Sequence, residues 1–407
     1  MTTDVAPPLP APKPRSAKEE TIRQKWIAIV EQLNDTFVQR QDAIRTMVLA
    51  YLTEQHYLLV GDPGTGKSAL CECMSSHFIE AKHFSALMGS FTPPDEIFGP
   101  VDIKGFQKGE WNRCTGGMLP EADFGFLDEI FKTNDGILNS LLKVLNERWF
   151  MGRRIPLRTC GTATNWPELQ TRSEKVAALY DRILLRCIVD DVSKREDVIL
   201  MLKAVDKVRG YKPQVKLTLD ELAATVEAIR RVDLSDPVRE QMHSVRTRLG
   251  PKKLSNGNVD KGINIGARRL GALQMVLRAN AWINGRDKVS IEDFASLKYC
   301  LWNDRPDFER VESILDTIDH ELVKRLVDLI DNGRQEYMSL SKTGFAAARV
   351  NQCTESIKKI VIEVRGALEE PVFTVKGRSE VAKAMSGLKD NFKELNRRAR
   401  QALGEAE

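Results

Sequence analysis

Apolar runs and amphipathic stretches alternate along the first half of the chain. Short runs suited to buried strands lie at residues 58–60, 82–87, 124–127, 158–164 and 183–189. Before and between them, apolar residues recur at every third or fourth position, as in residues 18–33, 41–54 and 137–145. The first pattern predicts strands and the second predicts helices. Their alternation is typical of an α/β fold with a parallel sheet.

Two glycine-containing segments in this half predict β-hairpins, at residues 101–113 and 149–157. Phe106 and Trp111 fall near the tip of the first. Exposed aromatic side chains are costly unless they meet something. We therefore expect these two either to face a substrate or a pore, or to pack on their own domain.

The second half of the chain reads as helical. Thr218–Glu221 and Ser290–Asp293 are capping boxes, and each precedes an apolar helical pattern. From residue 308 an apolar stripe continues to residue 330, and Asn332-Gly333 then predicts the end of that helix. Further helices are predicted at residues 344–368 and 378–403. We expect a helical hairpin or a three-helix appendage, whose basic last helix is either a solvated face or a surface for an acidic partner.

Composition narrows the class of protein. With 407 residues, 42% of them hydrophobic and 29% charged, the chain predicts a soluble globular protein of two or three domains. Its net charge of +4 is too small to indicate nucleic-acid binding. Seven cysteines suit a reducing cytosol, and we read all of them as packing residues. No window of about 18 apolar residues occurs, so we expect a cytoplasmic protein without a membrane span.

A phosphate-binding loop is the strongest chemical signal. An apolar strand leads into a G-x-x-x-x-G-K-S motif that opens a helix, the context such a loop requires; the motif and the next residue are Gly61, Asp62, Pro63, Gly64, Thr65, Gly66, Lys67, Ser68 and Ala69. Lys67 would neutralise the β- and γ-phosphates and Ser68 would ligate Mg²⁺. The alternative is a degenerate loop that does not hydrolyse nucleotide.

Polar residues also follow two later strands. Asp128 and Glu129 end the buried run that begins at Phe124, where ligands bind in open α/β sheets. Asp128 would hold the Mg²⁺ shell and Glu129 would activate the attacking water. Asn165 ends the next strand and could bind the γ-phosphate or the water, with Thr164 as the alternative if the register shifts by one.

Several short segments, in one order and spacing, together resemble the AAA+ ATPases, more narrowly the MoxR family and its RavA-like (regulatory ATPase variant A) branch. The resemblance covers residues 37–304, and the segments that carry it lie at residues 92–100, 119–122, 126–130, 137–139, 146–148 and 178–182. It implies a homo-oligomeric ring, usually a hexamer, with ATP and Mg²⁺ between neighbouring subunits. The two hairpins would be the inserts typical of the helix-2-insert branch.

The resemblance also assigns roles to single residues. Phe37 and Val38 would cradle the adenine, with His56 either nearby or capping a strand edge. Arg182 would be the arginine finger that reaches a neighbour's γ-phosphate, with Arg186 as second choice; without the resemblance, an arginine there is most often a surface ion-pair partner. Asn165 would be a sensor on the same subunit. Arg268, or Arg269 beside it, would be the second arginine sensor, although Ala267 stands where the family has proline.

The predicted domains are residues 1–16, a disordered proline-rich tail; 17–190, the nucleotide-binding domain; 191–305, an all-α lid; and 306–407, a helical arm. On this reading the protein hydrolyses ATP to remodel or mature a partner protein, with a separate von Willebrand factor A (vWA) domain protein as a candidate. ATP is favoured over GTP because no N-K-x-D-type segment follows the acidic pair. The alternatives are a DNA-dependent or restriction-type motor, a slow nucleotide-gated scaffold and, ranked low, magnesium insertion into tetrapyrroles.

Overall fold

The computed structural model describes residues 15–165, 174–253, 259–260, 262–343, 347–369 and 375–403, and most of the predicted N-terminal tail lies outside them. The chain divides into two compact units. The first contains Met1–Asp233 with Ala267–Asp287, and the second contains Leu234–Gly266 with Lys288–Glu407. No helix among the described residues is both long and apolar enough to span a bilayer.

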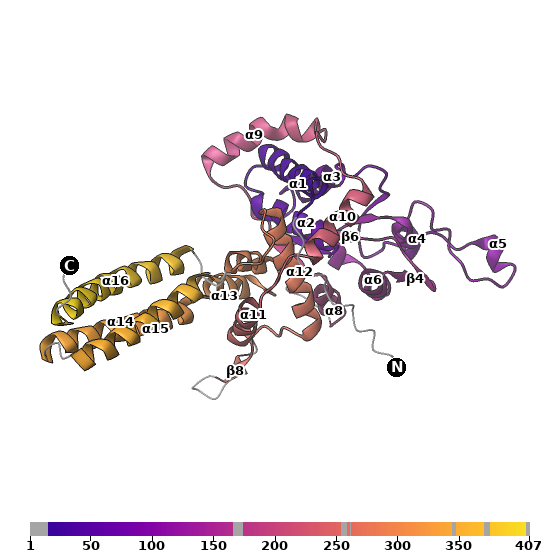
Figure 1. The fold of residues 1–407 in the computed structure, drawn as a ribbon. Helices are drawn as coiled ribbons and strands as arrows, with labels where there is room; N and C mark the ends of the chain where they lie inside the picture. The colour runs from indigo at the N-terminus through magenta and orange to yellow at the C-terminus, as the bar shows by residue number, and fades with distance from the viewer. Residues whose placement is uncertain are drawn as a thin grey trace. The chain divides into compact units, whose positions relative to one another are not determined.

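A five-stranded parallel sheet forms the centre of the first unit (Figure 1). Its strands are β1 (Tyr57–Val60), β2 (His83–Leu87), β3 (Phe124–Asp128), β6 (Thr159–Thr164) and β7 (Leu185–Ile188). They are ordered β2-β3-β6-β1-β7, and every pair is parallel. β1 and β6 are buried along their whole length, as expected of central strands covered on both faces. The predicted α/β fold is therefore confirmed.

Helices make up most of the rest of the first unit. They are α1 (Ala17–Thr36), α2 (Gln41–Thr53), α3 (Lys67–Ser75), α6 (Asp135–Glu147), α8 (Glu174–Arg182), α9 (Arg195–Arg209), α10 (Leu219–Arg230) and α12 (Ala267–Ile283). An aromatic cluster joins helix to sheet, because Phe78 lies 4.9 Å from Tyr51 and 4.7 Å from Phe124 between ring centroids. The predicted capping box of Thr218 and Glu221 starts α10.

Only one of the two predicted hairpins forms as expected. β4 (Trp149–Phe150) and β5 (Arg153–Arg154) pair antiparallel around Met151-Gly152. The other segment, which follows α4 (Pro94–Phe98), has a single antiparallel bridge between Val101 and Arg113. Instead of a strand, α5 (Ile103–Phe106) begins there, because the Asp102 side chain accepts a hydrogen bond from the backbone N–H of Lys104 and caps a helical turn.

The cysteines and the buried histidine are mostly structural. Six of the seven cysteines are buried, whereas Cys114 is exposed, so the prediction that all seven pack in the core is wrong for this one. His56 lies in the core, where Nδ1 accepts a hydrogen bond from the Cys160 N–H and Nε2 lies 2.7 Å from the Leu145 carbonyl oxygen. It therefore joins the beginning of β6, an inner strand of the sheet, to α6.

The second unit is almost entirely helical. It contains α11 (Asp236–Leu249), a short hairpin of β8 (Lys252–Lys253) and β9 (Val259–Asp260), a 3₁₀ segment (Ile291–Tyr299), α13 (Arg305–Asp316), α14 (His320–Thr343), α15 (Ala347–Glu369) and α16 (Val375–Leu403). The capping box of Ser290 and Asp293 forms as predicted, but it starts the 3₁₀ segment. α14, α15 and α16 pack against one another as the three-helix appendage.

The predicted helix end at Asn332-Gly333 is wrong. The stripe beginning at Phe308 breaks earlier, after Asp316, and α14 then continues through Gly333 to Thr343. A Cβ atom on Gly333 would lie 2.9 Å from Ile360 Cδ1 on α15 and 3.3 Å from Leu388 Cδ1 on α16. Glycine is present because three helices approach closely there, not because the helix ends.

Candidate functional site

The glycine-rich loop folds as a tight bend between β1 and α3. Gly64 and Gly66 have φ of +83° and +82°, a backbone region that side chains disfavour. A Cβ on Gly61 would lie 2.1 Å from the Val189 carbonyl oxygen, so that position needs glycine for space. α3 starts at Lys67, immediately after the bend. The first N–H groups of the helix and the positive end of its dipole therefore face the loop.

Lys67 is the buried cation of this loop. Its side chain is 7% exposed, and Nζ donates hydrogen bonds of 2.8 Å to the carbonyl oxygens of Gly61 and Asp62. Thr65 Oγ1 lies 3.3 Å from Nζ. Burial lowers the pKa of Lys67, and the nearby carboxylates of Asp128 and Asp62 partly oppose that shift. The ammonium group is thus held inside the loop where phosphate oxygens would replace the carbonyls.

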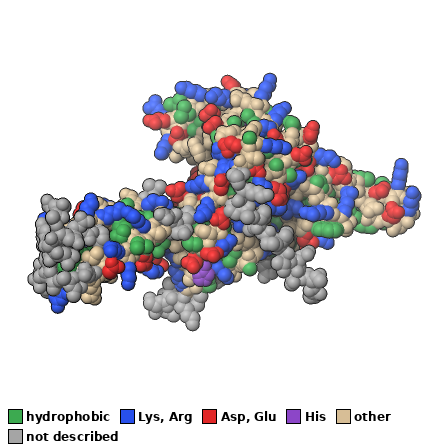
Figure 2. All heavy atoms as spheres, in the orientation of Figure 1, with side chains coloured by type: hydrophobic (Ala, Val, Ile, Leu, Met, Phe, Trp, Pro, Cys, Tyr) green, Lys and Arg blue, Asp and Glu red, His purple; other side chains and the backbone are tan. Residues whose placement is uncertain are grey.

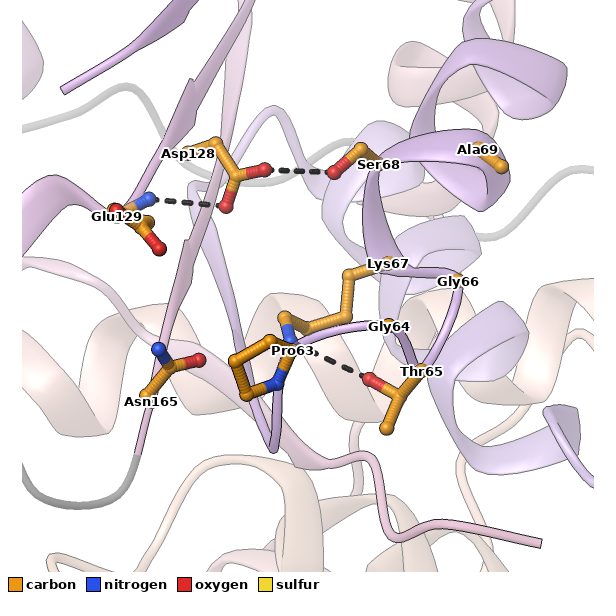
Figure 3. A pocket seen from close by; sticks show the side chains of 10 residues that line it. All are labelled: Pro63, Gly64, Thr65, Gly66, Lys67, Ser68, Ala69, Asp128, Glu129 and Asn165. Carbon is orange, nitrogen blue, oxygen red and sulfur yellow. Dashed lines mark hydrogen bonds between the residues drawn. The ribbon is translucent and has the colours of Figure 1, made fainter.

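The acidic pair meets the start of α3. The Ser68 hydroxyl donates a hydrogen bond of 2.7 Å to Asp128 Oδ2, and the Glu129 N–H donates one of 3.0 Å to Asp128 Oδ1 (Figure 3). Both oxygens of the Asp128 carboxylate are therefore held in place. Ser68 and Asp128, the two predicted magnesium ligands, therefore lie within hydrogen-bonding distance of each other.

Glu129 follows the strand in a left-handed conformation, with φ of +53°. That bend turns its side chain toward the loop, and the carboxylate forms an ion pair of 2.7 Å with Lys132. The 3₁₀ turn Ile130–Lys132 places Ile130 and Phe131 in the core, which fixes the position of the bend.

A cavity of about 290 Å³ joins these groups. It is lined by Pro63, Gly64, Thr65, Gly66, Lys67, Ser68, Ala69, Asp128, Glu129 and Asn165 (Figure 3). Asn165 comes from the end of β6, whereas Thr164 is fully buried and its carbonyl accepts a hydrogen bond from the Gly61 N–H. Asn165 is thus the residue of this pair that reaches the cavity. Gly61 and Asp62 do not line it, and they contribute the carbonyl oxygens that hold Lys67.

A second, mainly apolar cavity of about 270 Å³ shares four residues with the first: Gly64, Thr65, Gly66 and Ala69. Phe37 and Val38, the residues predicted to cradle the adenine, both line it. The sequence reasoning missed its opposite wall, which α9 supplies through Met201, Ala204, Val205 and Val208. These residues recur at helical spacing just after β7, a pattern that could have indicated a helix beside the loop. His56 does not line this cavity.

Among the residues that the structure describes, none of the predicted arginines lines either cavity. Arg182 ends α8, where Nη1 donates a hydrogen bond of 2.6 Å to the Ala178 carbonyl oxygen. Arg268 is exposed in the first turn of α12, and Arg269 beside it is half-buried. Arg186 is only 1% exposed and lies 3.8 Å from the Tyr180 ring centroid. Its guanidinium donates hydrogen bonds to the carbonyl oxygens of Ile183 and Tyr180, which hold it inside its own chain in this structure.

Comparison with protein families gives two matches. Residues 24–227 match the model of the MoxR domain in the MoxR–vWA–beta-propeller ternary systems. Residues 238–315 match the model of an AAA lid domain.

Individual relatives extend these matches over most of the chain. Two uncharacterised proteins of Methanocaldococcus jannaschii are 31% identical over 349 residues and 28% identical over 375 residues. Each alignment covers 83% of this chain, with 87% and 96% of the relatives. A structural protein of Acidianus two-tailed virus is 30% identical over 247 residues, 56% of this chain and 38% of the viral protein.

A crystal structure of a candidate ATPase from Cytophaga hutchinsonii has the same fold. It superposes with a TM-score of 0.57 at 17% identity and covers 74% of this chain and 95% of that protein. At this identity the likeness supports the fold alone.

Proposed function

Since this chain belongs to the MoxR family of AAA+ ATPases, we propose that it hydrolyses ATP with Mg²⁺ and uses the energy to remodel or mature a partner protein. One observation carries the proposal. Lys67, Ser68, Asp128, Glu129 and Asn165 come from three separate segments and line one cavity. That set contains the groups that phosphoryl transfer to water needs.

The donor set at Ser68 and Asp128 fits magnesium. Mg²⁺ prefers oxygen ligands and is usually held by one or two carboxylates together with substrate phosphates. A hydroxyl and a carboxylate lie 2.7 Å apart here. The described residues contain no cluster of three or more metal-ligating side chains, so they offer no all-protein cage for a softer metal. When bound, the ion would neutralise charge on the β- and γ-phosphates.

Each remaining residue of the cavity has a role in hydrolysis. Lys67 exchanges its carbonyl partners for phosphate oxygens and stabilises their charge. Glu129 accepts a proton from the attacking water. Asn165 hydrogen-bonds the γ-phosphate or that water from the end of β6. The base occupies the apolar cavity between Phe37, Val38 and α9, where aromatic and aliphatic side chains cover it.

We further propose that the active form is a ring, a hexamer by analogy with the family. Arg182 lines neither cavity of its own subunit, and an arginine in that position can complete the site of a neighbour by stabilising γ-phosphate charge. Arg268 serves as the lid sensor. Residues 17–190 form the nucleotide-binding domain, 191–305 the lid and 306–407 the arm, in the RavA-like arrangement.

The partner is a protein rather than nucleic acid. The family model that matches describes a MoxR domain acting with a vWA protein, so a separate vWA-domain protein is the first candidate. Lysine and arginine side chains are interspersed with acidic ones over the face drawn in Figure 2. On that face, therefore, no one-sided positive field of the kind that nucleic acid binds is present. We place the protein in the cytoplasm, because ATP is available there and its reducing conditions keep cysteines as free thiols.

Steady-state phosphate release from Mg-ATP tests the proposal. The wild-type protein should hydrolyse ATP, and Lys67→Ala should abolish turnover because the loop loses its phosphate-binding cation. Lys143→Ala, an exposed lysine on α6, is the matched control and should keep wild-type turnover. Wild-type turnover by Lys67→Ala, or stimulation by DNA in a salt-dependent manner, would contradict the proposal.

A further inference from the structure

A buried arginine supports the glycine-rich loop from outside the triphosphate cavity. Arg40 precedes α2, is 7% exposed and lines the apolar cavity. Its Nε and Nη2 atoms donate hydrogen bonds of 3.2 and 3.1 Å to a single acceptor, the carbonyl oxygen of Thr65. Nη1 donates a third, of 2.9 Å, to the Gln39 carbonyl oxygen. Two N–H groups of the guanidinium therefore hold the loop at one carbonyl oxygen.

The charge of Arg40 is not neutralised by a direct ion pair. Among the described residues, none of the ion pairs involves Arg40, and its three hydrogen bonds all go to neutral carbonyl groups. Burial lowers its pKa, and the more distant charge of Asp191 opposes that shift. A guanidinium nevertheless stays protonated at neutral pH. A buried cation without a carboxylate partner is costly, and a nearby anion would relieve that cost.

Thr65 connects Arg40 to Lys67. The Thr65 hydroxyl donates a hydrogen bond of 2.9 Å to the Asp62 carbonyl oxygen and lies 3.3 Å from Lys67 Nζ. Arg40 thus holds the main chain of the residue whose side chain contacts the phosphate-binding lysine. Two cations, one lining each cavity, therefore contact the same loop residue.

The backbone beside Arg40 is also fixed. Gln39 adopts φ of +54°, an uncommon conformation for a residue with a side chain. Its amide Nε2 donates a hydrogen bond to Asp197 on α9. The segment that carries Phe37 and Val38 is therefore anchored to α9 at one point and, through Arg40, to the glycine-rich loop at another.

We propose that Arg40 is a positioning residue for the phosphate chain of the nucleotide. It braces the loop through the Thr65 carbonyl and supplies buried positive charge that the bound polyphosphate compensates. This inference rests on the proposed ATP-binding function and adds to it a residue outside the glycine-rich motif. Its hydrogen bonds go to backbone carbonyls and it does not line the triphosphate cavity, so Arg40 should affect affinity rather than the chemical step.

Comparing a ligand that has a base with one that lacks it separates the contribution of the phosphate chain to affinity from that of the base. N-methylanthraniloyl-ATP is bound to the full-length protein and displaced with ATP or with inorganic tripolyphosphate, which has no base. Arg40→Gln keeps a polar side chain that can still bond the Thr65 carbonyl but removes the charge. Both ligands should bind this variant at least about tenfold more weakly, because the buried positive charge that attracts the phosphates is lost. In hydrolysis assays KM should rise while kcat stays within about twofold.

Two further variants make the result specific. Arg40→Lys restores the charge without the paired donors and should recover part of the affinity for both ligands. Arg23→Gln is the matched control, because Arg23 is also largely buried and donates to a carbonyl oxygen, that of Ile283, away from the site. It should bind both ligands within about twofold of wild type.

The outcomes distinguish this inference from the proposed function. Weaker binding of ATP with unchanged binding of tripolyphosphate would place Arg40 at the base and overturn the inference, as would unchanged binding of both. A kcat that falls with KM unchanged would also overturn it. If the wild-type protein binds neither ligand, the proposed function itself fails.

Discussion

The Ser68 hydroxyl donates a hydrogen bond of 2.7 Å to Asp128 Oδ2, although 60 positions separate the two residues in the sequence. The contact joins the first turn of α3 to the carboxyl end of β3. A hydroxyl and a carboxylate therefore lie side by side in the cavity, and we propose that Mg²⁺ binds there.

Asp128→Asn should raise the magnesium concentration that gives half-maximal ATPase activity by about tenfold or more. The amide keeps the hydrogen bond with Ser68 but loses the charge that attracts a hard cation. Titration of Mg²⁺ at saturating ATP measures this. Asp135→Asn, on the first turn of α6, is the control and should leave the titration unchanged. Equal magnesium dependence in both variants would remove Asp128 from the metal site.

Gly61→Ala should destabilise the protein by about 1–3 kcal/mol, the usual cost of forcing extra atoms into a packed site. The new Cβ would lie 2.1 Å from the Val189 carbonyl oxygen, and backbone cannot move aside cheaply. Chemical denaturation measures the difference in the free energy of unfolding. Gly116→Ala is the control, because nothing lies within 4 Å of its Cβ position. Equal stability of the two variants would mean that the close approach of β7 to the loop is wrong.

His56 should make the protein less stable in mild acid. Burial lowers its pKa to about 4, from an ordinary value of 6.5. The unfolded chain therefore binds a proton between pH 6.5 and 4 that the folded protein does not, so stability falls as the pH falls through this window and levels off below it. At pH 5 the loss from this group is on the order of 2 kcal/mol relative to pH 7.5.

Denaturation of wild type, His56→Gln and His243→Gln at both pH values tests this. Glutamine can accept from the Cys160 N–H and donate to the Leu145 carbonyl oxygen without titrating, so His56→Gln should lose less stability on acidification. His243 is exposed, and its variant should follow wild type. An unchanged pH dependence in His56→Gln would show that His56 is not the buried neutral group described here.

Arg182 should act on the neighbouring subunit. Arg182→Ala should bind ATP within about threefold of wild type but lose at least about a hundredfold in turnover, because a finger contributes mainly to the transition state. Mixing it with Glu129→Gln should restore some activity, since a site formed by an intact Glu129 and a neighbour's intact Arg182 can reassemble. Failure of every mixing ratio to exceed the two parents would contradict a role between subunits.

Local motifs explain why much of the site was predictable. The glycine-rich loop and the Asp128-Glu129 pair each lie within one short segment, and parallel strands bring their carboxyl ends to one edge. Asn165 followed from the same rule. Arg40 did not, because its partner Thr65 lies 25 positions away and the contact depends on how α2 packs against the loop.

Other differences come from packing that no local pattern records. The α9 wall of the apolar cavity depends on where the helix after β7 folds back. Glycine occurs both at helix ends and where helices approach closely, so the local sequence at Gly333 does not distinguish the two. At residues 101–113, an N-cap at Asp102 favours a helical turn over the hairpin strand that the glycine-containing turn predicts.

The central claim is that the glycine-rich loop and the acidic pair act on one triphosphate. Its most direct test compares Glu129→Gln with Glu147→Gln, an exposed glutamate on α6, for ATP affinity at equilibrium and for cleavage of the bound ATP in a single turnover. We predict that Glu129→Gln binds ATP as tightly as wild type and cleaves it at least about a hundredfold more slowly, while Glu147→Gln matches wild type in both. Cleavage of bound ATP by Glu129→Gln at the wild-type rate would contradict the account.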